Sequence, residues 1–126
     1  MNGRNLLALH KFIIQNKMPF KNLKDLKEKE LIRGYKVKFI HSKNMTFAYW
    51  DIEANAPLPE HSHPHEQVAN IIEGKFELNT GDETKILEPG QVAVIPPNTK
   101  HSGKAITKCR IIDVFYPIRE DHLNLK

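Results

Sequence analysis

Residues 59–67 read Pro59-Glu-His-Ser-His-Pro-His-Glu-Gln67, and three histidines, Glu66 and Gln67 fall within this one short stretch. Imidazole nitrogens and carboxylate or amide oxygens are common protein ligands of divalent cations. The stretch therefore predicts a metal site, and the spacing of the five side chains indicates which of them bind the ion.

The first two histidines share one face of an extended chain. Because successive side chains of a strand point to opposite faces, His61 and His63 point the same way and can chelate one ion. Pro64 removes a backbone hydrogen-bond donor, so we expect the strand to break there. His65 then turns away from the ion as an exposed residue of the turn.

Two further ligands come from outside this pair. Gln67 opens the next strand on its inward face, and Glu66 faces solvent on the other side. His101 ends the stretch Gly90-Gln-Val-Ala-Val-Ile-Pro-Pro-Asn-Thr-Lys-His101, in which a buried strand and a turn deliver it to a strand start. Three imidazoles and one amide oxygen leave positions for water or substrate, as in catalytic sites. The alternative is that these are ordinary polar residues of a metal-free protein, as we expect for His10, His41 and His122.

From residue 31 onward, short alternating runs of β-branched and aromatic residues are separated by turn residues. We expect strands near 35–41, 44–54, 67–73, 74–79, 84–88, 91–95 and 106–116. Many short strands with no helices between them are typical of an all-β sandwich or barrel. The 126 residues fit one such domain, which we place at residues 31–126.

Residues 1–30 have a different pattern and form an N-terminal extension. Apolar residues at helical spacing predict a short amphipathic helix there. They are Leu6, Leu7, Leu9, Ile13 and Ile14. Lys21, Asp25 and Lys29 lie four apart and predict a second helical turn. We expect this extension to pack on the main domain or on a partner chain, without a chemical role.

The composition argues against several classes of protein. The net charge is +4 and the pI near 9.2, but the lysines alternate with acids as on a solvated surface, so we expect no nucleic-acid partner. No apolar run reaches the ~18 residues that a membrane span needs. The one cysteine, Cys109, excludes an intrachain disulfide and agrees with a reducing compartment. We therefore expect a cytoplasmic protein with no membrane segment.

Two motifs in this sequence resemble those of the cupins. The first cupin motif is Gly, His-x-His, Glu and Gly, and at its spacing this sequence has Asn55, His61-Ser-His63, Gln67 and Gly74. The second is Gly, Pro-x-Gly, His and Asn, and here Gly90, Pro96-Pro97-Asn98, His101 and Ala105 stand at those positions. Asn tolerates the left-handed backbone that glycine adopts, so we expect both turns to be kept. The resemblance implies a jelly-roll barrel, or double-stranded β-helix.

The second informative stretch is Arg110-Ile-Ile-Asp-Val-Phe-Tyr-Pro-Ile-Arg119. Strand parity puts Asp113 and Phe115 on one face, and Arg119 shares this parity beyond the end of the strand. A carboxylate among apolar neighbours costs several kcal/mol unless it is paired or used. Asp113 and Arg119 therefore form either a salt bridge at the barrel mouth or a functional pair. In the second case Asp113 is a general acid/base, Arg119 binds a substrate carboxylate, and Phe115 forms an apolar wall.

Together these stretches resemble a narrower group, the KdgF-type cupins of pectin and alginate breakdown, over most of residues 33–119. The resemblance implies one divalent ion, nickel, zinc, manganese, iron or cobalt, bound by His61, His63, Gln67 and His101. It implies that Asp113, Phe115 and Arg119 act on the substrate, which is a small anionic sugar. The reaction is the conversion of 4,5-unsaturated monouronates into linear 4-deoxy-5-keto uronates. Cupins commonly form homodimers, and we expect one here.

Two rival functions stay open from the sequence. One is another metal cupin acting on a small molecule, such as a dioxygenase or an isomerase. The other is a non-catalytic cupin that binds a sugar acid.

Overall fold

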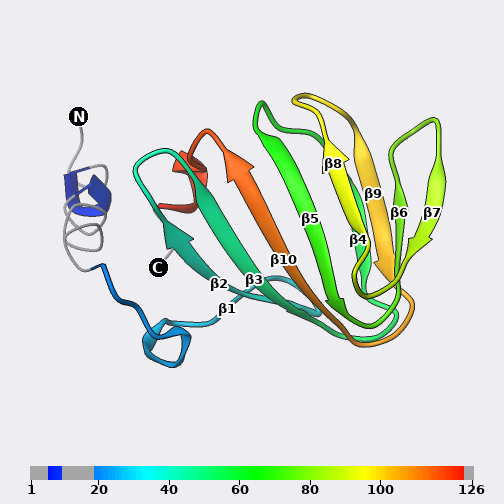
Figure 1. The fold of residues 1–126 in the computed structure, drawn as a ribbon, viewed down its shortest axis with the longest axis horizontal. Coiled ribbons are helices and arrows are strands. Elements are labelled where there is room, and N and C mark those ends of the chain that lie inside the picture. Colours follow the sequence, from blue (N-terminus) through cyan, green and yellow to red (C-terminus); the bar gives the residue numbers. More distant parts are fainter. Residues whose placement is uncertain (1–5, 10–18, 124–126) are drawn as a thin grey trace.

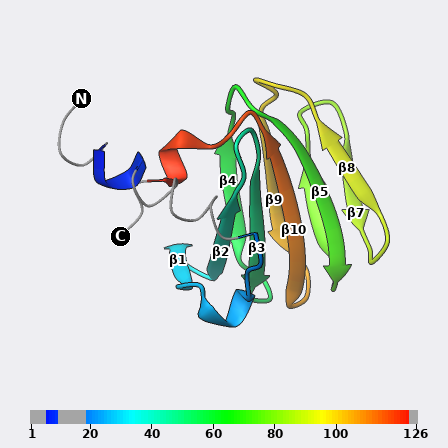
Figure 2. The same ribbon diagram turned by 60° about the vertical axis from the view of Figure 1, so that its left-hand side comes forward.

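Ten strands form two antiparallel sheets in the computed structural model of the chain, which describes residues 6–9 and 19–123 (Figure 1). The larger sheet has the order β1-β2-β3-β10-β5-β8, and the smaller has the order β4-β9-β6-β7. The strands are β1 (Lys29–Ile32), β2 (Tyr35–His41), β3 (Thr46–Ile52), β4 (Pro57–His61), β5 (Glu66–Glu73), β6 (Phe76–Asn79), β7 (Thr84–Leu87), β8 (Val92–Ile95), β9 (His101–Ala105) and β10 (Cys109–Tyr116). In the turned view of Figure 2 the two sheets form two layers, and the predicted all-β fold class is confirmed.

Strand β10 lies in the middle of the larger sheet, between β3 and β5, and alternates between buried and more exposed residues. Its buried residues are Cys109, Ile111, Asp113 and Phe115, and those of β5 are Gln67, Ala69 and Ile71. The inward parity predicted for both strands is confirmed. Asp113 pairs with Ala48 on one side and Ala69 on the other, so its carboxylate lies between small side chains on the inner face.

Apolar side chains from both sheets fill the space between them. The cluster contains Tyr35, Ile52, Ile71, Phe76, Leu78, Leu87, Ile95 and Ile111. Burying one aliphatic or aromatic side chain of this size contributes roughly 1.5–3 kcal/mol. This cluster therefore holds the sheets together, and the polar inward residues of β5, β9 and β10 lie beside it.

Two asparagines occupy the left-handed turns that precede the candidate ligands. Asn55 has φ of 69° and Asn98 has φ of 63°, so the prediction that these turns keep their shape without glycine is confirmed. The turn at Asn98 also supports the neighbouring loop, because its backbone N–H donates to the His63 carbonyl oxygen at 2.7 Å. The backbone thereby ties the segment before β9 to the loop after β4.

Several sequence-based expectations about the first residues and the strands differ from the structure. Residues 6–9 are helical, as expected, whereas Ile13 and Ile14 lie outside the described residues. The prediction of a second helical turn through Lys21, Asp25 and Lys29 is wrong. Only the 3-10 helix η1 (Leu23–Asp25) forms there, and Lys29 begins β1. Strand β1 was not expected. The strand expected around His61 is β4, which ends at His61, and β9 begins at His101 as expected, although no bounds were predicted for either; β10 begins three residues later than the strand expected at 106–116. In the described part of the chain, no helix has the length and apolar character needed to cross a membrane.

Candidate metal centre

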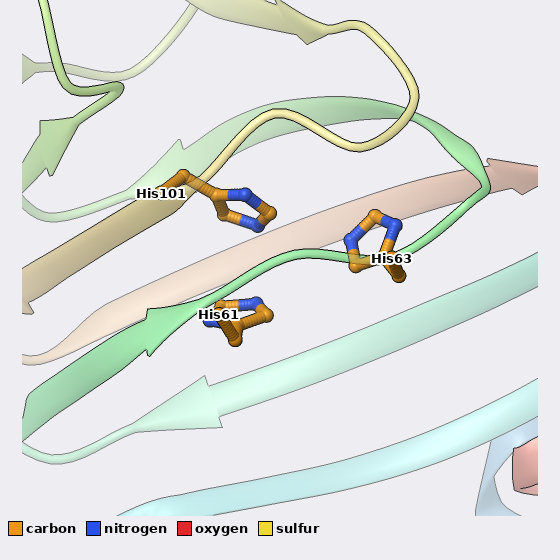
Figure 3. Close-up of side chains that lie close together, drawn as sticks. All are labelled: His61, His63 and His101. Atoms are coloured by element: carbon orange, nitrogen blue, oxygen red, sulfur yellow. The ribbon is translucent and has the colours of Figure 1, made fainter.

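Strand pairing in the smaller sheet brings two of the predicted ligands together. His61 ends β4 and His101 begins β9, and these two residues pair directly in the antiparallel register. Their ring centroids lie 4.1 Å apart. His63 follows two residues after His61 in the loop that Asn98 supports. Figure 3 shows the three imidazoles gathered around one space, and one ring nitrogen from each lies within 4.8 Å of the others.

A backbone carbonyl oxygen lies beside Nδ1 of all three rings and selects the tautomer that donates from Nδ1. Nδ1 of His61 is 2.9 Å from the Pro59 oxygen, and Nδ1 of His101 is 2.8 Å from the Thr99 oxygen. Nδ1 of His63 is likewise 3.1 Å from the His65 oxygen. A carbonyl oxygen only accepts hydrogen bonds, so each Nδ1 carries the proton and donates. In this tautomer Nε2 carries a lone pair, which is the form of the ring that binds a metal ion.

Gln67 lies beside this group on β5 and is buried. Its Oε1 is 3.0 Å from Nε2 of His63. Burial, followed by the charge of Arg119, lowers the pKa of His63 to about 4, so the ring is neutral at pH 7. A neutral ring has one N–H, which cannot serve both the His65 carbonyl and the Gln67 oxygen. A cation between Nε2 and Oε1 would remove the conflict.

The His101 ring provides a second test of whether a cation fits. His101 is 2% exposed, and its Nε2 is buried without a hydrogen-bond partner in the described structure. Leaving such a group unsatisfied costs about 1–3 kcal/mol. A bound cation would satisfy it, and three imidazoles with one amide oxygen suit zinc, nickel, iron, cobalt or manganese. The residues present therefore fit a divalent metal ion.

The two other candidate ligands of the opening stretch do not join the group. His65 is not among the three clustered histidines, and Glu66 is exposed at the start of β5. The exposed position of Glu66 agrees with the prediction, whereas His65 lies outside the group but is partly buried rather than exposed.

Asp113 is buried on β10 and faces the same space. Its Oδ2 accepts a hydrogen bond from Nε1 of Trp50 at 3.0 Å, whereas its Oδ1 is buried without a hydrogen-bond partner in the described structure. Burial raises the pKa of Asp113 to about 6, while Gln67, Trp50 and Arg119 act in the opposite direction. Gln67 lowers the pKa of Asp113 as a side-chain hydrogen-bond donor to the carboxylate, so its amide nitrogen faces Asp113 and its amide oxygen faces His63.

Arg119 and Phe115 form one wall beside these groups. The guanidinium carbon lies 4.7 Å from the centroid of the Phe115 ring, which contacts the His63 ring edge-on at 5.5 Å. One interpretation of the sequence proposed a salt bridge between Asp113 and Arg119, and the structure does not contain it. Arg119 binds Asp121 instead, through Nη2 and Oδ2 at 2.7 Å.

A single pocket of about 330 Å³ joins all of these side chains. Its polar lining includes His61, His63, Gln67, His101, Asp113 and Arg119. Its remaining wall is mostly apolar and belongs to the core cluster, together with Leu31, Ile32 and Leu58 near the first strand and β4. The pocket can therefore bind a small anionic molecule with its charged end toward Arg119.

The family model described as the cupin domain matches residues 48–115, which includes every strand from β4 to β9 and most of β3 and β10. This chain belongs to the cupin family.

Solved structures of similar cupins extend this result. This cupin is similar to an RmlC-like cupin from Shewanella frigidimarina, with 26% identity, a TM-score of 0.79, and 86% of this chain and 98% of that chain covered. It is similar to KdgF from Halomonas sp., with 25% identity, a TM-score of 0.77, and coverage of 82% and 98%. Ectoine synthase from P. lautus shares the fold at 20% identity, with a TM-score of 0.73 and coverage of 81% and 80%. The resemblance to cupins, and to KdgF among them, is confirmed.

Three residues of this cupin's site were not singled out by the sequence. Trp50 binds Asp113, Asp121 binds Arg119, and Thr46 accepts the Arg119 backbone N–H at 2.9 Å. Parity along β3 could have put Trp50 on the inner face with Ala48. For Asp121 there was no such signal, because the chain leaves the strand at Pro117 and alternation no longer applies.

Proposed function

We propose that this cupin is a metal-dependent enzyme that converts 4,5-unsaturated monouronates into linear 4-deoxy-5-keto uronates. The observation that supports this most is Asp113, a buried carboxyl group in the same pocket as three clustered histidines and an arginine. Its raised pKa is suited to moving protons near neutral pH. The similarity to KdgF supports the same reaction.

Arg119 is assigned to the substrate carboxylate. A guanidinium binds a carboxylate with two parallel hydrogen bonds, which fixes both the position and the orientation of the sugar. Phe115 lies beneath the guanidinium and lines the same pocket, where we assign it to the apolar wall beside the sugar. Substrate without the carboxylate should therefore bind poorly.

Asp113 is assigned to the proton transfer. Opening of the cyclic hemiacetal breaks the bond between C1 and the ring oxygen, removes the proton of the C1 hydroxyl, and leaves a C1 aldehyde and an enolate at C5. A proton added at C4 then gives the 5-keto product, so the reaction is an isomerisation with no other reactant. Trp50 keeps the carboxylate oriented through its hydrogen bond to Oδ2. A divalent cation held by His61, His63, Gln67 and His101 would supply positive charge to the developing enolate oxygen.

The test is to incubate the metal-loaded protein with unsaturated monouronate and follow the ultraviolet absorbance of the conjugated alkene. We expect the absorbance to decrease much faster than it does spontaneously. With the Asp113→Asn variant it should decrease only at the spontaneous rate. Binding of the uronate without loss of absorbance would indicate a sugar-acid-binding protein and would refute the proposed reaction.

A second candidate function is favoured by one feature of the pocket. Much of its wall is apolar, including Ile71, Phe76, Leu78 and Ile111, and offers few partners for sugar hydroxyl groups. Such a wall also suits a small apolar substrate of a redox cupin, for example a dioxygenase. Oxygen consumption that requires added iron would favour this alternative over the uronate reaction.

A further inference from the structure

Asp121 holds the side chain of Arg119 with two hydrogen bonds. Nε of Arg119 donates to Oδ1 at 3.0 Å, and Nη2 donates to Oδ2 at 2.7 Å. Asp121 lies in the 3-10 helix η2 (Glu120–His122), just beyond the strand that carries Asp113. The arginine side chain is 12% exposed, whereas that of Asp121 is 55% exposed, so the acid contacts the guanidinium from the solvent side.

The backbone of Arg119 is also fixed. Its N–H donates to Oγ1 of Thr46, a residue with no exposed surface. The same Oγ1 lies 2.8 Å from Nδ1 of His41, which is buried on β2. Arg119 is therefore anchored at its backbone by β3 and at its guanidinium by Asp121.

This double anchoring leaves part of the guanidinium available. Arginine has five N–H donors, and Asp121 uses Nε–H and one of the Nη2 hydrogens. The two hydrogens on Nη1 and the second hydrogen on Nη2 do not bind Asp121. Arg119 lines the pocket, so these hydrogens are available to a ligand there. Burial lowers the pKa of both His63 and His101, and the positive charge of Arg119 acts in the same direction, as expected for a cation near the candidate metal ligands.

We propose that Asp121 is a positioning residue that fixes Arg119 for recognition of a substrate carboxylate, and that it thereby sets the preference of the pocket for acidic over neutral sugars. This inference rests on the proposed function of the pocket. A long arginine side chain loses conformational freedom when it binds a ligand, and an acid that already holds it removes part of that loss.

A purely structural role of Asp121 makes a different prediction. If Asp121 only stabilised the fold, its loss would lower the melting temperature and leave carboxylate binding unchanged. An ion pair whose acid is more than half exposed adds little to stability, so we expect the melting temperature hardly to change. A positioning role instead changes the binding of carboxylates. The matched control is Glu120, an exposed acid that precedes Asp121 in the same 3-10 helix.

The experiment compares the wild type with Asp121→Asn, Asp121→Glu and Glu120→Gln, all metal-loaded. Calorimetry measures binding of galacturonate and of galactose, which differ by the carboxylate, and kinetics with unsaturated monouronate give KM and kcat. We expect Asp121→Asn to lose about tenfold in preference for galacturonate and to raise KM by a similar factor, while kcat changes far less. Asp121→Glu should recover part of the loss, and Glu120→Gln should behave as wild type.

Wild-type KM and preference in Asp121→Asn would overturn the inference, as would an equal loss in Glu120→Gln or a wild type that does not prefer galacturonate. A wild type that binds galacturonate selectively through Asp121 but does not convert the uronate would refute the proposed reaction and leave the positioning role intact.

Discussion

Replacement of His101 by leucine should separate the metal-binding role of this residue from its contribution to folding. His101 is buried at the start of β9, donates from Nδ1 to the Thr99 carbonyl, and has a buried Nε2 without a partner in the described structure. Loss of the Nδ1 hydrogen bond lowers the free energy of unfolding by about 1 kcal/mol. Removal of the unsatisfied Nε2 raises it by about 1–3 kcal/mol. Because the adjoining pocket gives the leucine room, we expect the metal-free His101→Leu variant to be as stable as the metal-free wild type or slightly more stable.

With metal the order should reverse. A ligand at a hundred times its dissociation constant stabilises a protein by about 2.7 kcal/mol, which is roughly 10 °C in melting temperature for a domain of this size. Wild type should gain this stabilisation with zinc, nickel or manganese, and His101→Leu should gain almost none. The assay is thermal unfolding with and without each metal, together with the metal content of the purified protein.

His65→Leu is the matched control. It replaces a histidine of the loop after β4 whose Nδ1 is also buried without a hydrogen-bond partner among the described residues, but which lies outside the three-histidine group. We expect it to keep both the metal and the shift in melting temperature. A His101→Leu variant that melts well below the wild type when both are metal-free, yet purifies with the full metal content of the wild type, would refute the assignment of His101 as a ligand.

Other changes test the remaining parts of the site. Asp113→Asn should abolish turnover while metal content stays at the wild-type value, and full activity in this variant would remove Asp113 from the mechanism. Trp50→Phe removes the donor to Asp113 and should lower kcat with little effect on KM, whereas an unchanged kcat would show that the hydrogen bond is dispensable. Burial lowers the pKa of both His41 and His122 from 6.5 to about 4. Their unfolded forms take up protons near pH 6.5 and their folded forms only near pH 4, so the stability that the neutral rings contribute is complete above pH 6.5. It is lost between these values at about 1.4 kcal/mol per pH unit for each ring. Urea unfolding of metal-free His41→Asn at pH 7 and pH 5 should therefore show a smaller loss of stability than the wild type, and an equal loss would contradict this account.

The sequence predicted the parts of the fold that depend on local alternation. The inward faces of β5 and β10 followed from the spacing of apolar residues, and the turns at Asn55 and Asn98 followed from the backbone freedom of asparagine. The bounds of strands β4 and β9 could not be predicted in this way, although a strand around His61 and a strand start at His101 were expected. Two of the five residues of β4 are prolines, and β9 has no β-branched residue, so both depend on their pairing with each other, in which His61 meets His101.

In the site, too, local spacing predicted some residues, whereas others depend on how the chain folds. The cupin spacing selected His61, His63 and His101, and the structure brings these three together. The bond between Asp121 and Arg119 depends on how the chain turns after β10, which no periodic pattern describes. The homodimer and the cytoplasmic location stay predictions, and sedimentation equilibrium would test the first.

Anomalous X-ray diffraction from crystals of the metal-loaded protein would test most directly whether one cation is shared by His61, His63, His101 and Gln67. The account predicts a single strong peak about 2.0–2.3 Å from each Nε2 and from Oε1 of Gln67. A crystal with no peak between these side chains, or with Gln67 or His101 turned outward, would contradict it.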